Sequence, residues 1–129
     1  MLLSVYLLDF GAEVFYVGAT GRYPERIAEH LALMRAGHHP NRRVQGAYAL
    51  YGVPIVSVLE TLRVSTPQEA ADTESKHILK YREAHPFHVC NVALADPRGF
   101  EGWFPIPDED LQWSRSDNGS GKSTLPSNP

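Results

Sequence analysis

Two short apolar segments near the start of the chain, residues 2–8 (LLSVYLL) and residues 14–19 (VFYVGA), constrain the fold most. Both are rich in β-branched and aromatic residues, and the five residues between them include a central glycine, Gly11. This pattern is typical of a β-hairpin. Neither segment alternates cleanly between apolar and polar residues, which favours a sheet covered on both faces. A turn centred on Gly11 would place Tyr6 directly opposite Tyr16.

Two helices are predicted after the hairpin. Pro24 suits the first turn of a helix over residues 25–36, and Gly37 is a plausible residue to end it. Asn41 can cap a second helix, which again ends at a glycine, Gly52.

One more strand and one more helix complete the predicted fold. Residues 54–63 (PIVSVLETLR) read as a strand. Residues 66–69 (TPQE) have the pattern of a capping box, with proline in the first turn, and open a helix that runs to about Ala84. The order β-β-α-α-β-α predicts an α+β domain in which helices flank a small three-stranded antiparallel sheet.

Charge and composition divide the chain into a domain, residues 1–95, and an acidic tail, residues 96–129. The domain carries nine acidic and nine basic side chains, whereas the tail carries six acidic and three basic ones, so the net charge of -3 lies in the tail. The tail is rich in Pro, Ser and Gly, which is typical of a partly disordered segment. We expect Trp103 and Phe104 to fold its first part back on the core.

The apolar start of the chain does not predict a membrane segment. Residues 2–8 are interrupted by Ser4 and closed by Asp9, and no Lys or Arg precedes them, so they read as neither a membrane span nor a signal peptide. A single cysteine, Cys90, excludes an internal disulfide and a four-cysteine zinc site. We expect a cytoplasmic protein with no membrane partner, and the sequence leaves its oligomeric state open.

Glu74 is the most informative polar residue of the chain. At 100° per residue it lies in the middle of an apolar stripe on the third predicted helix, among Ala70, Ala71, Ile78 and Tyr81. An uncompensated buried carboxylate costs several kcal/mol. Glu74 is therefore expected to be ion-paired, neutral or bound to a metal ion.

A basic stretch covers the first predicted helix and the start of the second. Arg26 and His30 are four residues apart and share the margin of the apolar face of the first helix. This stretch suits binding to phosphate groups, and a solvated mixed-charge surface is the alternative. Its charged residues are five arginines and two glutamates: Arg22, Arg26, Arg35, Arg42, Arg43, Glu25 and Glu29.

The two predicted hairpin strands carry Ser4-Val5-Tyr6 and Tyr16-Val17-Gly18, and here the chain resembles the GIY-YIG nuclease superfamily. The resemblance runs from Ser4 to Asn91, which makes residues 1–95 a GIY-YIG-like nuclease domain, and the order β-β-α-α-β-α is also that of the family. One position departs from the motif, because Ser4 replaces its first glycine, a change that affects local backbone geometry. The other positions that carry the resemblance are Arg26, His30, His39, Glu74 and Asn91.

The resemblance implies a metal-dependent DNA endonuclease that hydrolyses phosphodiester bonds. Glu74 would bind one divalent ion, Mg²⁺ or Mn²⁺, and Tyr6 would act as general base toward the attacking water, which requires a pKa well below its usual value of about 10. Arg26 would stabilise the charge on the phosphate. Tyr16 and His30 would orient the water and the phenol, and Asn91 would support the site through a hydrogen bond. Substrate contacts are expected at His39, Arg42, Arg43 and Asn91.

Two other readings of the sequence compete with a nuclease. A nucleic-acid-binding module with the same fold and no cleavage activity remains open. Residues 118–124 (NGSGKST) resemble half of a phosphate-binding P-loop, but Ser116 stands where its first glycine should be.

No zinc cluster, helix-turn-helix pattern or basic tail is present to add sequence-specific binding. The sequence therefore favours a stand-alone nuclease of a phage, a mobile element or DNA repair over a site-specific homing enzyme.

Overall fold

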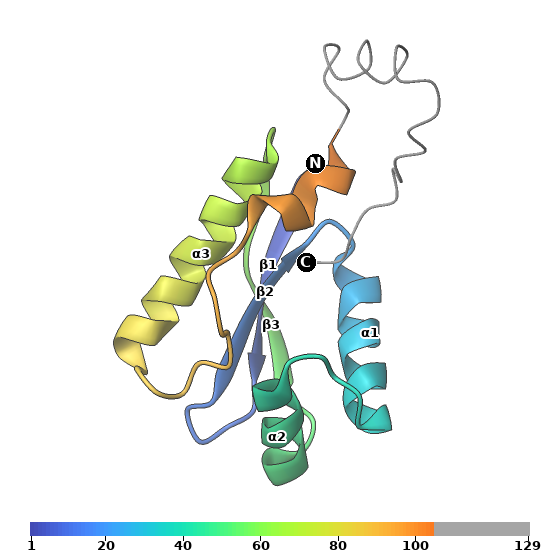
Figure 1. Ribbon diagram of the computed structural model, residues 1–129, viewed down its shortest axis with the longest axis vertical. Coiled ribbons are helices and arrows are strands. Elements are labelled where there is room, and N and C mark those ends of the chain that lie inside the picture. Colours follow the sequence, from blue (N-terminus) through green and yellow to red (C-terminus); the bar gives the residue numbers. More distant parts are fainter. Residues whose placement is uncertain (105–129) are drawn as a thin grey trace.

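The computed structural model describes residues 1–104 and confirms the predicted α+β fold (Figure 1). The three strands form one antiparallel sheet in the order β2-β1-β3, with β1 in the centre. A short 3₁₀ helix, η1, follows the predicted elements. The elements in chain order are β1 (Leu2–Asp9), β2 (Phe15–Thr20), α1 (Tyr23–Ala36), α2 (Arg42–Tyr51), β3 (Ile55–Arg63), α3 (Pro67–Ala84) and η1 (Pro97–Trp103).

Helices cover both faces of the sheet, which explains why apolar and polar residues do not alternate along its central strand, β1. Figure 1 shows α1 and α2 on one side of the sheet and α3 with η1 on the other. Alternate residues of β1 are buried in two separate clusters. Leu3, Val5 and Leu7 pack toward α3 and η1, whereas Tyr6 and Leu8 pack toward α1 and α2. The prediction of a sheet covered on both faces is confirmed.

The capping residues start the helices where the sequence predicts. The side chain of Asn41 accepts hydrogen bonds from the backbone N–H groups of Arg43 and Val44 at the start of α2. The Thr66 hydroxyl accepts one from Glu69 at the start of α3. Gly37 ends α1 in the left-handed conformation, with a φ of 77°.

The hairpin register differs from the predicted one by two residues. Tyr6 pairs with Gly18 and Leu8 pairs with Tyr16, so the prediction that the two tyrosines face each other directly is wrong. The turn is centred on Ala12 rather than Gly11, because Gly11, Ala12 and Glu13 all adopt positive φ angles. A shift of two residues keeps a side chain on the same face, so both tyrosines still point toward α1.

The absence of a side chain at Gly18 leaves the space that the Tyr6 ring occupies. A Cβ atom at position 18 would collide with the ring and the hydroxyl oxygen of Tyr6. We expect Gly18→Ala to destabilise the protein by roughly 1–3 kcal/mol, because the buried ring must shift. Urea unfolding measures the effect.

Gly46 supplies a matched control for this prediction. It lies within α2, and a Cβ atom there would contact nothing within 4 Å. Gly46→Ala should therefore stabilise the protein by about 0.5–1 kcal/mol, as alanine does in a helix interior. Equal unfolding midpoints for wild type and Gly18→Ala would contradict the close approach of Tyr6 to Gly18.

The chain beyond Ala95 packs on the core through η1. Phe100 is buried against α3, and Trp103 and Phe104 are partly buried beside the same cluster. The guanidinium of Arg22 lies 5.7 Å from the centre of the Trp103 ring. Most of the predicted tail, including the P-loop-like residues 118–124, lies outside the described residues. Within residues 1–104, no helix combines the length and the apolar character needed to cross a membrane.

Candidate active site

The outer edge of β2 positions two of the predicted site residues, Glu74 and Asn91. Its outward N–H groups come from alternate residues, and each has a partner. Phe15 donates to the His88 carbonyl oxygen at 2.9 Å, and Val17 donates to Asn91 Oδ1 at 3.0 Å. The third, from Ala19, donates to the carboxylate of Glu74. Because a sheet edge must satisfy its backbone groups, β2 holds Asn91 and Glu74 side by side.

Glu74 is a buried carboxylate that opens onto a cavity. It is 7% exposed and lines a cavity of about 270 Å³ together with Tyr16, Asn41 and Asn91. Burial raises the pKa of Glu74 to about 8, while the Ala19 N–H and the charge of Arg26 act in the opposite direction. None of the ion pairs among residues 1–104 includes Glu74. The structural ion pair that the sequence left open is therefore not formed, and a neutral or metal-bound carboxylate remains.

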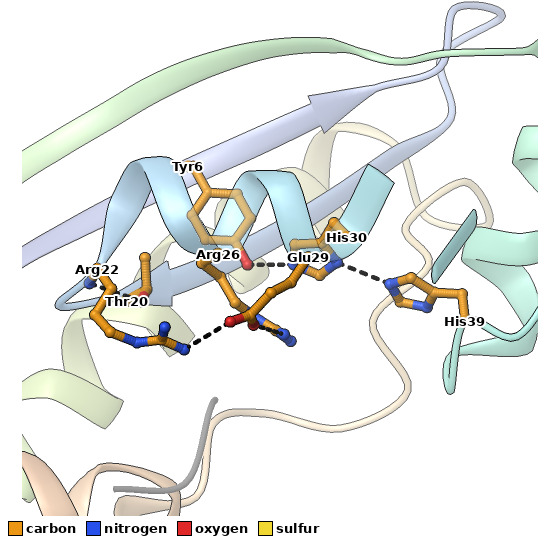
Figure 2. A network of polar contacts seen from close by, with 7 residues as sticks. All are labelled: Tyr6, Thr20, Arg22, Arg26, Glu29, His30 and His39. Atoms are coloured by element: carbon orange, nitrogen blue, oxygen red, sulfur yellow. Dashed lines mark hydrogen bonds and ion pairs between the residues drawn. The ribbon is translucent and has the colours of Figure 1, made fainter. Parts of the chain in front are cut away.

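Arg26 is held by an acidic neighbour and keeps a donor free. Figure 2 shows Glu29 between two arginines, with its carboxylate oxygens 3.1 Å from Arg26 and 3.0 Å from Arg22. The Nε atom of Arg26 is buried and has no hydrogen-bond partner. A buried unsatisfied donor is costly unless a ligand uses it. The Arg26 side chain also faces the Tyr6 hydroxyl, whose pKa it acts to lower, and a bound anion would reach the buried Nε only after the side chain shifts.

A continuous chain of hydrogen bonds fixes the Tyr6 hydroxyl (Figure 2). Tyr6 Oη lies 2.6 Å from His30 Nε2, and His30 Nδ1 lies 2.8 Å from His39 Nε2. At the far end, the backbone N–H of Asn41 donates to His39 Nδ1 at 3.0 Å. These bonds join α1, β1 and the segment before α2.

The direction of this chain follows from its last donor. Burial and the charge of Arg26 lower the pKa of His30 to about 3, and burial also lowers the pKa of His39, so both rings are neutral near pH 7. Since His39 Nδ1 accepts from the Asn41 N–H, its proton is on Nε2 and is donated to His30 Nδ1. The His30 proton is then on Nε2 and is donated to Tyr6. His30 stabilises a phenolate at Tyr6 and cannot remove the Tyr6 proton.

The protein groups alone do not lower the pKa of Tyr6. Burial raises it well above its usual value, and the charges of Tyr16 and Glu74 raise it further, against Arg26. Burial likewise raises the pKa of Tyr16 to about 12. A cation beside Glu74 would offset part of this effect, because it neutralises one of the charges that disfavour the phenolate.

Most of the predicted site residues lie together in the structure. Two of them, Arg42 and Arg43, lie apart from the others. Arg42 and Arg43 are exposed on the first turn of α2. Arg43 lines a wider groove of about 660 Å³, which shares Asn91 and Val92 with the cavity. The predicted site residues that line the cavity or lie directly behind it are Tyr6, Tyr16, Arg26, His30, His39, Glu74 and Asn91.

Two residues of the site were missed in the sequence. Asn41 was expected only to cap a helix, but it lines the cavity, donates to the Cys90 carbonyl oxygen and fixes the tautomer of His39. Glu29 was counted only as a charge. Its position three residues after Arg26 on a helix is the signal that could have indicated the pair.

Comparisons with known proteins identify the fold. No family model matches the chain, and no curated protein matches it in sequence. Among solved structures, the chain is similar to a mutant of the catalytic domain of intron endonuclease I-TevI, with a TM-score of 0.64 and 19% identity. The match covers 74% of this chain and 98% of that domain. It confirms the fold that the resemblance to the GIY-YIG nucleases implied.

Proposed function

We propose that the protein is a metal-dependent DNA endonuclease that hydrolyses phosphodiester bonds at the Glu74 cavity. The observation that supports this most is the carboxylate of Glu74, which is buried, opens onto the cavity and has no ion pair within the described part of the chain. It occurs in a fold shared with the catalytic domain of an endonuclease.

One Mg²⁺ or Mn²⁺ ion fits the donors of the cavity. A hard divalent cation is bound through one or two carboxylates, with waters completing its coordination, and Glu74 is such a carboxylate. The amide oxygen of Asn91 accepts from Val17, so we assign it no metal contact. When bound, the ion supplies positive charge for the phosphate and for the leaving oxygen.

The residues around the cavity divide the reaction among them. Tyr6 first releases its own proton to solvent once a cation beside Glu74 offsets the effect of burial on its pKa. The phenolate then takes a proton from the attacking water, whose oxygen forms a bond to phosphorus while the bond to the leaving sugar oxygen breaks. The leaving oxygen takes its proton from solvent. The N–H of His30 holds the phenolate, and the guanidinium of Arg26 binds phosphate oxygens. Tyr16, on the cavity wall, orients the water.

Two of the expected substrate contacts receive a different role in this proposal. Both ring nitrogens of His39 are in use, and it is 7% exposed. The amide of Asn91 binds the backbone of Val17 through both its oxygen and its nitrogen. We assign His39 to orienting His30 and Asn91 to holding the edge of β2. Arg42 and Arg43, which are exposed on the first turn of α2, remain the proposed contacts to DNA.

Incubation of the purified chain with DNA tests this function. Supercoiled plasmid, branched and single-stranded DNA are each compared with Mg²⁺ and with EDTA. We expect cleavage only with the metal, and loss of cleavage in Tyr6→Phe, which keeps the ring beside Gly18. Binding to DNA without cleavage would identify a non-cleaving nucleic-acid-binding module, and neither binding nor cleavage would reject both functions.

A further inference from the structure

A second group of metal-ligating side chains lies at the other end of β2. The β1–β2 turn and the C-terminal end of α3 lie at the same end of the molecule (Figure 1). There Glu13, from the turn, meets His85 and His88, which follow α3. Their ligand atoms all lie within 4.8 Å of one another, and His85 Nδ1 is 3.8 Å from Glu13 Oε2. This group adjoins Phe15, whereas Glu74 binds Ala19, about 13 Å further along the strand.

The two histidines are placed by a turn and by aromatic packing. His85 ends α3, and its ring packs against Phe15 with centroids 4.7 Å apart and stacks on Tyr81 at 6.4 Å. The backbone N–H of His88 donates to the His85 carbonyl oxygen at 3.1 Å, which closes a turn with Pro86 at its second position. This turn brings the two imidazoles to one side of the chain.

Glu13 reaches the histidines from a strained backbone. Glu13 and Ala12 have φ angles of 62° and 51°, a conformation that costs about 1–2 kcal/mol for each residue other than glycine. Backbone strain of this kind gathers at functional sites. At 3.8 Å, the Glu13 carboxylate is too far from His85 for a direct hydrogen bond, and it is largely exposed.

We propose that Glu13, His85 and His88 bind one Zn²⁺ ion, with a water molecule as fourth ligand. Two imidazoles and one carboxylate form a three-ligand zinc set. Neighbouring ligands in a tetrahedral zinc site lie about 3.4 Å apart. Here His85 Nδ1 and Glu13 Oε2 are 3.8 Å apart and all three ligand atoms lie within 4.8 Å of one another, so the ion must draw the exposed side chains of Glu13 and His88 inward. Imidazole nitrogens favour Zn²⁺ over Mg²⁺, which prefers oxygen. This site is therefore chemically distinct from the Glu74 cavity.

The ion stabilises the segment that covers the edge of β2. His88 accepts from the Phe15 N–H through its carbonyl oxygen, and the Cys90 N–H donates to the Phe15 carbonyl oxygen at 2.7 Å. The same segment carries Asn91 to the cavity. A metal ion that ties His88 and His85 to Glu13 links this segment to the β1–β2 turn, and it stabilises the folded state by binding it alone.

Thermal unfolding of the untagged chain tests the zinc site. After removal of metal by EDTA and dialysis, Zn²⁺ is expected to raise the unfolding temperature by at least about 4 °C, and an equal concentration of Mg²⁺ much less. Isothermal titration should give one Zn²⁺ per chain. No shift with Zn²⁺ in the wild-type chain would overturn the proposal.

Matched variants locate the ion. His88→Ala and Glu13→Gln replace exposed side chains and should lose the Zn²⁺ shift, whereas the exposed His38→Ala, outside the group, should keep it. Glu74→Gln should also keep it, so failure of the proposed nuclease function leaves this result unaffected. A shift of wild-type size in both His88→Ala and Glu13→Gln would refute the assignment.

Discussion

Glu74→Gln is expected to abolish Mg²⁺-dependent DNA cleavage and to make the protein more stable at pH 8. Glutamine keeps the shape of the side chain and an oxygen for the Ala19 N–H, but it removes the carboxylate that would bind the ion. Cleavage should fall by at least about two to three orders of magnitude, with DNA binding retained. Cleavage at the wild-type rate would exclude Glu74 as the metal ligand.

The gain in stability follows from the raised pKa of Glu74. The folded protein releases this proton near pH 8, whereas an unfolded chain releases it near pH 4.5. The stabilising effect of the bound proton is therefore complete below about pH 4.5 and is lost as pH rises through about 8. At pH 8 the neutral glutamine avoids a cost on the order of several kcal/mol. Urea unfolding without metal, at pH 5 and pH 8, measures this difference.

The pH comparison separates this effect from a general change in packing. Wild type should lose stability between pH 5 and pH 8, and Glu74→Gln should lose much less. If wild type and Glu74→Gln lost the same free energy of unfolding between pH 5 and pH 8, Glu74 would have an ordinary pKa.

Arg26→Lys is expected to lower turnover by about two orders of magnitude or more, with little change in DNA binding. Lysine keeps the positive charge but lacks the fork of donors that lets Arg26 bind Glu29 and direct a further N–H donor to a phosphate. If this donor acts on the transition state, kcat falls, as it does on removal of an oxyanion donor. Single-turnover cleavage and DNA-binding titrations measure the two quantities separately.

Arg35→Lys provides the control for Arg26→Lys. Arg35 is exposed in the last turn of the same helix, so this change should leave both turnover and binding unchanged. If Arg26→Lys weakened DNA binding and turnover in parallel, Arg26 would instead be a contact to the substrate ground state.

Local signals in the sequence predicted the elements, and longer-range geometry decided the register. Asn41, Thr66 and Gly37 cap helices through contacts a few residues away, so the caps could be predicted from the sequence. The hairpin register depends on Ala12 and Glu13 adopting the left-handed conformation, which residue type does not predict.

The sequence predicted which residues form the candidate site better than it predicted the hydrogen bonds between them. Glu74 was identified from its place on an apolar helix face, and the tyrosines from the resemblance. The hydrogen bonds from Tyr6 through His30 to His39 join residues 24 and nine positions apart, and only the tertiary structure defines them. The assignment of His39 and Asn91 to the substrate stays a prediction. In the structure both side chains are buried and their polar atoms make hydrogen bonds within the protein, which sequence spacing does not indicate.

The Mg²⁺ concentration that gives half-maximal cleavage, measured between about pH 6 and pH 9, tests most directly whether Glu74 binds the catalytic ion. Below pH 8 the ion must displace the Glu74 proton. Each unit of lower pH should therefore raise the half-saturating Mg²⁺ concentration about tenfold, with a plateau above pH 8. Cleavage with a half-saturating Mg²⁺ concentration that stays constant from pH 6 to pH 9 would contradict metal binding at Glu74.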